Sequence, residues 1–124
     1  MHNSRPLSLG RQLREARVRA RLKPKDLARK AGVSLAALYN CERADRGGRT
    51  KTLIALALAL GLSLRIPDLP SLSVGQGLKE AKLAEISGLA FGTVRSTLTR
   101  PDGGNVKTLE RIAHVLGEPV VLVV

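Results

Sequence analysis

Arginine and lysine are the residues of this sequence whose number and spacing could do chemistry. They total 21 against 10 aspartates and glutamates, which gives a formal net charge of +11 at pH 7. Residues 1–66 carry 15 basic and 4 acidic side chains, a net of +11, whereas residues 67–124 carry 6 of each, a net of zero. A dense positive charge attracts nucleic acid or another anionic surface. The sequence therefore predicts a polyanionic partner for its first half and a different electrostatic role for its second.

Other reactive residue types are few and scattered. The sequence has one cysteine, Cys41, and two histidines, His2 and His114. It shows no clustered acid–base pair, nucleophile–base pair or metal-ligand spacing, so we expect no enzyme activity, no cofactor and no metal site. Cys41 falls at a core-facing helical position, where a cysteine acts as a small apolar packing residue.

The apolar stretches of the chain are short. The longest, residues 53–62, is about half of the roughly 20 residues that a membrane-spanning helix needs. The N-terminal residues 1–6 lack the apolar run of a secretory signal. These features predict a cytoplasmic protein without a membrane partner, in which residues 53–62 form a buried helix.

The segments that must position the basic residues occur twice in the sequence. Residues 25–66 align without a gap on residues 81–122, at an offset of 56 residues. A match at fixed offset indicates a repeated fold. We expect two units, residues 1–66 and 67–124, which share an interface because a unit of about 60 residues is only marginally stable alone. The matched pairs are core alanines and leucines and the glycines between helices, among them Leu27/Leu83, Ala28/Ala84, Gly32/Gly88, Leu53/Leu109 and Gly61/Gly117.

Apolar periodicity and capping residues predict the helices of both units. Ser34 and Asn105 are expected N-caps, and Gly32 and Gly88 are expected to end the helices that precede them. The first unit has predicted helices at residues 8–22, 24–31, 34–43 and 50–60, and the second at residues 79–87, 91–100 and 106–116. The first helix is covered outside its apolar stripe, as a solvated face would be, by Arg11, Arg14, Arg17, Arg19 and Arg21.

The second unit departs from this helix pattern at its start, and both units add a short tail after their last helix. Residues 69–77 occupy the place of a first helix, but their proline and glycines argue against a full helix. Both units end in β-prone tails, residues 62–66 and 120–124, and residues 72–74 are a candidate third strand. Short strands must pair to be stable. Pairing within the chain would give an intrachain pseudo-dimer with a pseudo-two-fold axis, and pairing between chains would give a homodimer.

The spacing of small and apolar residues in the first unit fits a helix-turn-helix. The order Leu27-Ala28-x3-Gly32-Val33-Ser34-x3-Leu38 allows close crossing of two helices, a tight turn and an outward second helix. The segment KDLARKAGVSLAALYNCER, followed by TLIALALALGLSL, resembles the Cro and cI-repressor-like (XRE) family over residues 9–66, and more weakly over 78–124. The strand tails resemble those of HipB-type antitoxins. The resemblance implies a mainly α fold of two tandem lambda-repressor-like helix-turn-helix bundles, each followed by a short β-strand.

The resemblance also implies which residues contact double-stranded DNA. Base contacts fall on Leu35, Ala36, Tyr39 and Asn40, and Asn is the usual reader of adenine. In the second unit the equivalent places hold Phe91, Gly92, Arg95 and Ser96, and the candidate contacts there are Phe91, Arg95, Ser96 and Arg100. The sequence departs from the family at Pro24, where a phosphate-gripping Gln is common, and at Leu35, where a polar reader is usual. Phosphate contacts fall on Lys23, Lys25, Arg43, Arg46, Arg49 and Lys51.

These observations predict a sequence-specific transcriptional regulator that represses by occupying DNA. The first unit would read the major groove, and the second would have a structural or dimerising role. Two-fold symmetry would then imply a palindromic operator with half-sites about one helical turn apart. Two alternatives stay open from the sequence. One is an antitoxin whose second unit binds a toxin protein, and the other is an architectural protein that coats DNA through charge alone.

Overall fold

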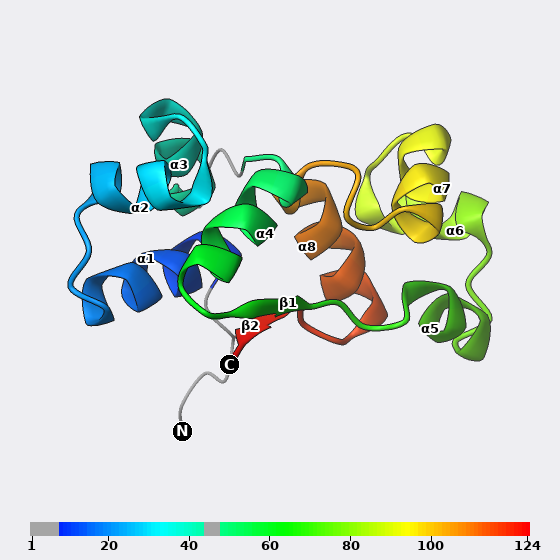
Figure 1. Ribbon diagram of the computed structural model, residues 1–124. Helices are drawn as coiled ribbons and strands as arrows, with labels where there is room; N and C mark the ends of the chain where they lie inside the picture. The colour runs from blue at the N-terminus through cyan, green and yellow to red at the C-terminus, as the bar shows by residue number, and fades with distance from the viewer. Residues whose placement is uncertain (1–7, 44–47) are drawn as a thin grey trace, which may run out of the picture.

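The computed structural model describes residues 8–43 and 48–124, which contain eight helices and two strands (Figure 1). They form two four-helix groups, each followed by a strand, which confirms the predicted mainly α class. The first half consists of α1 (Leu9–Arg19), α2 (Pro24–Ala31), α3 (Leu35–Glu42), α4 (Thr50–Ala59) and β1 (Ser63–Arg65). The second half consists of α5 (Leu69–Gly75), α6 (Glu80–Ser87), α7 (Phe91–Thr99), α8 (Val106–Leu116) and β2 (Val121–Val123).

The helix ends lie where local chemistry places them. The side chain of Ser34 accepts a hydrogen bond from the Ala37 N–H, so it supplies one of the acceptors that the first turn of α3 lacks. Asn105 caps α8 in the same way through Lys107 N–H. Gly32 and Gly88 end α2 and α6 with φ of 72° each, a left-handed conformation that glycine adopts at little cost. The predicted bounds of α2 and α8 are therefore correct to the residue.

The predicted strand at residues 72–74 is wrong, because these residues lie inside α5. Asp68 caps this helix by accepting from Ser71 N–H, and Pro70 occupies its first turn, where no N–H is needed. Gly75 is its last residue, so the proline and glycines that argued against a helix sit at its ends. Leu69 is buried in the core and anchors the helix there. At seven residues α5 is shorter than the eleven-residue α1, because the chain before it is used for β1 and a linker.

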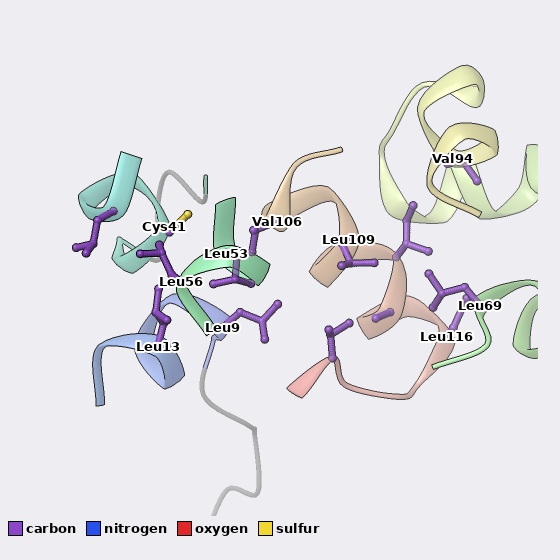
Figure 2. Packing of buried hydrophobic residues seen from close by; sticks show 14 of the residues in the cluster. Leu9, Leu13, Cys41, Leu53, Leu56, Leu69, Val94, Val106, Leu109 and Leu116 are labelled. Carbon is purple, nitrogen blue, oxygen red and sulfur yellow. The ribbon is translucent and has the colours of Figure 1, made fainter. Parts of the chain in front are cut away.

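One hydrophobic cluster runs through both halves. Leu53 of α4 and Leu109 of α8 are fully buried at its centre, with Val106 between them (Figure 2). Leucines of α1 and α3 extend the cluster on one side, and Leu69, Val94 and Leu116 extend it on the other. The two halves therefore share an interface, as the marginal stability of a 60-residue unit requires.

The strand tails pair within the chain. β1 and β2 are antiparallel, with Ser63 opposite Val123, Leu64 opposite Leu122 and Arg65 opposite Val121. Arg65 and Val121 are also counterparts at the 56-residue offset, so this strand residue pairs with its own equivalent. Of the two pairings left open by the sequence, the described residues form the intrachain one.

A second seam joins the halves at the starts of α4 and α8. Arg49 and Asn105 form an antiparallel bridge, and they too are counterparts at the 56-residue offset. Thr50 N–H donates to the Gly104 carbonyl and Val106 N–H donates to the Gly48 carbonyl, each at 2.9 Å. This exchange is reciprocal, because Thr50 corresponds to Val106 and Gly48 to Gly104. Self-pairing at both seams is the arrangement that a two-fold axis between the halves would produce.

Glu110 of the second half caps a helix of the first. Its Oε2 accepts a hydrogen bond from the Leu9 N–H at the start of α1, at 3.0 Å. Burial raises the pKa of Glu110, and the Leu9 hydrogen bond and the Lys107 charge oppose this shift only in part. Because its pKa is higher in the folded than in the unfolded state, this carboxyl makes its full contribution to stability at a pH below its ordinary pKa of 4.5. That contribution is lost as the pH rises through the folded-state pKa.

We therefore expect the Glu110→Gln variant to melt at a higher temperature than the wild-type protein near pH 7. Its amide oxygen still accepts from Leu9, but it carries no buried charge. The difference should shrink towards about pH 4, where the wild-type carboxyl is increasingly protonated. Calorimetry at both pH values measures it, with Glu110→Ala as a control that loses the acceptor and should be less stable. A Gln variant less stable than wild type near pH 7 would contradict this account.

Candidate nucleic-acid interface

Helices α2 and α3 form a helix-turn-helix in the described structure. The turn is closed by the Val33 N–H, which donates to the Ala28 carbonyl at 3.0 Å, beside the left-handed Gly32. Ala28 is buried where the two helices cross, and its small side chain permits their close approach. Leu38 and Cys41 turn one face of α3 into the core. The opposite face of α3 is left to solvent.

The four predicted base-contact residues lie on that solvent face. Leu35 is 40% exposed and Tyr39 is 45% exposed, and Ala36 and Asn40 are also exposed. Positions three or four residues apart share one face of a helix, which places Leu35 and Ala36 beside Tyr39, and Ala36 beside Asn40, on a continuous surface. It combines one amide, able to donate and accept at a base edge, with apolar groups and a phenol. The structure brings the predicted residues together, and their contact with DNA bases stays a prediction.

A partly buried ion pair fixes α3 against α1. Arg17 of α1 contacts Glu42, the last residue of α3, through Nε at 2.7 Å and Nη2 at 3.1 Å. Arg17 Nη1 also donates to the Leu22 carbonyl at 3.0 Å. The hydrogen bond and charge of Glu42 raise the pKa of Arg17 against the opposing effect of burial. The expectation that the arginines of the first helix form a solvated face is therefore wrong for Arg17, whose side chain is only 11% exposed.

The second half has no equivalent ion pair at these positions. At the 56-residue offset Arg17 corresponds to Ser73 and Glu42 corresponds to Leu98, so both partners change together between the halves. The Ser73 hydroxyl donates to the Leu78 carbonyl, just as Arg17 donates to the equivalent Leu22 carbonyl. Because most positions differ between the halves, the change at these two positions does not by itself reveal the contact.

The predicted phosphate-contact residues surround α3. Lys23 and Lys25 lie at the start of α2, and Arg43 is the residue after α3. Arg49 and Lys51 lie at the start of α4, beside the seam between the halves. All five are exposed, and Arg46 lies outside the described residues. The exposed basic groups therefore stand at the ends of the helices that hold α3, where they could reach a DNA backbone.

The second half presents an equivalent exposed helix, α7. Phe91 is 48% exposed, and Gly92, Arg95 and Ser96 are exposed as well. A hollow of about 680 Å³ runs from α7 to the start of α4. Arg95 and Arg100 line it together with Lys51 of the first half, and Asp102 is the acidic residue in its lining. Cations from both halves thus face a common hollow.

The six basic and six acidic residues of the second half are unevenly distributed. Helix α7 contains no acidic residue, while three of the acids elsewhere are held by hydrogen bonds or an ion pair. Asp68 caps α5, Glu85 lies 3.5 Å from Lys82, and Glu110 caps α1. Although this half is neutral overall, Arg95 therefore stands on α7 without an acidic residue on the same helix.

A second hollow, of about 880 Å³, lies between α5, α6 and α7. Its lining is mostly apolar and includes Val74, Leu78, Phe91 and Leu98. It occupies the place that the Arg17–Glu42 ion pair fills in the first half, because Ser73 and Leu98 stand at those two positions. The first half thus has an ion pair between its first and third helices, where the second half has a mostly apolar hollow.

The remaining reactive groups have structural roles or no cluster around them. Cys41 is fully buried, as predicted, and burial raises the pKa of its thiol to about 11, so the thiol stays protonated at neutral pH. Among residues 8–43 and 48–124, no three His, Cys, Asp or Glu side chains are placed to hold a metal ion. None of the helices in this part of the chain is long and apolar enough to cross a bilayer.

Comparison with known proteins finds a family match in the first half. Residues 8–66, from α1 to the end of β1, match the helix-turn-helix domain family. No curated protein and no solved structure matches the chain. The family match coincides with the part of the chain that carries the charge excess and the exposed face of α3.

Proposed function

We propose that this helix-turn-helix protein binds double-stranded DNA sequence-specifically and regulates transcription, as a repressor, by occupying its operator. The observation that carries the proposal is the outward face of α3, which joins Asn40 to Leu35, Ala36 and Tyr39 on one surface. The resemblance to Cro and cI-like (XRE) repressors over residues 9–66 supports the same reading. The charge of +11 supplies the electrostatic attraction that DNA binding needs.

In this proposal α3 lies in the major groove and α2 crosses the DNA backbone. The side-chain amide of Asn40 accepts a hydrogen bond from adenine N6–H through Oδ1 and donates one to adenine N7 through Nδ2. Leu35 and Ala36 offer apolar contact to thymine methyl groups. Lys23, Lys25 and the cations at the start of α4 bind phosphates, which sets the register of α3 without reading sequence. Repression then needs only occupancy, because a protein in the groove blocks access to the promoter.

We expect Asn40→Ala to weaken binding to the operator by about 1–3 kcal/mol and to leave binding to a random duplex nearly unchanged. The loss of a bidentate base contact affects one sequence, whereas phosphate contacts serve all sequences. Fluorescence anisotropy with an operator recovered by selection from random duplexes measures both affinities. His114→Ala, an exposed change at the end of α8, is the control that should alter neither. Equal losses on both duplexes would contradict base reading by Asn40.

The architectural alternative is favoured by a different observation, the size of the charge excess. A protein that coats DNA through charge binds all duplexes alike, and its affinity falls steeply with salt. A salt series on the selected and scrambled duplexes separates the two functions. A preference for the selected duplex that persists at physiological salt supports the regulator, and equal affinities that fall together support the architectural protein.

A further inference from the structure

The two halves are joined as the subunits of a two-fold dimer would be. Both seams pair residues with their own counterparts, Arg65 with Val121 in the sheet and Arg49 with Asn105 between the helix starts. In Figure 1, α3 and α7 lie at opposite ends of the molecule, and both lie on the side away from the two strands. The chain thus carries two outward helices on one side, each in a helix-turn-helix with a left-handed glycine at its turn.

The outward surface of α7 has chemistry that suits DNA. Arg95 and Ser96 are exposed on it, and the hollow beside it is lined by Arg95, Arg100 and Lys51. An arginine in the major groove binds guanine O6 and N7 with two hydrogen bonds, the commonest specific contact of this kind. The Lys51 side chain comes from the first half, so the cations in this hollow span the seam between the halves.

The two surfaces differ at each equivalent position. Tyr39 and Asn40 of α3 correspond to Arg95 and Ser96 of α7, and Leu35 corresponds to Phe91. Identical recognition helices related by a two-fold axis read a palindrome. Helices with different side chains in the same arrangement read two different half-sites, so the palindromic operator expected from the sequence does not follow from this structure.

We propose that a single chain binds two successive major-groove half-sites of a non-palindromic operator, with α3 reading one and α7, through Arg95, reading the other. This inference rests on the proposed DNA-binding function. The strand pairing that could have joined two chains is formed within one, so the chain acts as its own dimer. The half-sites lie about one helical turn apart, because both helices face the same side of the duplex. An adenine-bearing half-site faces Asn40, and a guanine-bearing half-site faces Arg95.

The experiment begins with selection of duplexes about three helical turns long from a random pool by the full-length chain. We expect two unlike half-sites about one turn apart, and a sedimentation mass that fits one 13.3-kDa chain per duplex. A palindromic motif bound by two chains, or a single half-site with no second element, would overturn the inference.

Variants then assign each half-site to its helix. We expect Arg95→Ala and Asn40→Ala each to weaken binding to the selected duplex about 10- to 100-fold. On a duplex whose guanine half-site is scrambled, Arg95→Ala should bind like the wild-type protein, while Asn40→Ala should still lose affinity. Arg65→Ala is the charge-matched control, because Arg65 is exposed and belongs to β1, a strand that lies on the side of the molecule away from both helices (Figure 1). Thermal melting of each variant checks that it folds.

The outcomes separate this inference from the function on which it rests. A wild-type protein with no preference for the selected duplex over a scrambled one would overturn the proposed function itself. Specific binding that depends on Asn40 but responds to Arg95→Ala no more than to Arg65→Ala would overturn only the role of α7. An Arg95→Ala loss that is equal on intact and scrambled guanine half-sites would reduce Arg95 to a phosphate contact and would also overturn it.

Discussion

Glu42→Ala is expected to lower the free energy of unfolding by about 3 kcal/mol, because it leaves the Arg17 guanidinium buried without its carboxylate. The two side chains are 11% and 7% exposed, and Nε and Nη2 of Arg17 both contact Glu42. Removal of one member of such a pair exposes the desolvation cost of the other. Urea denaturation followed by circular dichroism measures the loss.

The second half of the chain supplies the matched control for this variant. Ser73 and Leu98 stand at the positions of Arg17 and Glu42. The double variant Arg17→Ser, Glu42→Leu therefore gives the first half the two residues that the second half has there. Its serine can bond the Leu22 carbonyl as Ser73 bonds that of Leu78. We expect the double variant to recover more than half of the stability that Glu42→Ala loses, since it leaves no buried charge. A double variant as unstable as Glu42→Ala would show that the loss comes from packing.

Gly10→Ala is expected to destabilise the protein by about 1–3 kcal/mol or more, because α1 and α3 meet without room for a methyl group. A Cβ at position 10 would lie 2.5 Å from the Cys41 carbonyl oxygen and 3.0 Å from that of Glu42. Both atoms belong to the backbone of α3, so relief requires the helices to move apart. Thermal and urea unfolding give the change in stability.

Gly92→Ala is the control for the glycine substitution. A Cβ at this position in α7 meets nothing within 4 Å, so the same chemical change brings no clash. Alanine restricts the unfolded chain more than glycine does, and a compatible replacement stabilises a protein by roughly 0.4–1 kcal/mol. We therefore expect the two variants to shift the melting temperature in opposite directions. A Gly10→Ala protein as stable as Gly92→Ala would show that the α1–α3 contact is looser than described.

Features governed by neighbours in the sequence could be predicted well. The Ser34 and Asn105 caps and the left-handed Gly32 and Gly88 depend on residues within a few positions, and the helix ends they mark are observed. The exposed face of α3 followed from the spacing of Leu38 and Cys41, which turn the opposite face into the core. Helix α5 was missed because Leu69 is anchored by burial against distant residues, which outweighs the weak helix propensity of its neighbours.

The sequence by itself determined the helix-turn-helix, the likeness of the two halves, the charge excess of the first and the residues exposed on α3. Each of these is a property of composition, of local spacing or of the 56-residue repeat. Only the tertiary structure decided that the strand tails pair within one chain, that Arg17 binds Glu42, and that Arg95 of α7 shares a hollow with Lys51 of the first half. The reason is physical: each depends on contacts between residues far apart along the chain, which the folded arrangement alone brings together.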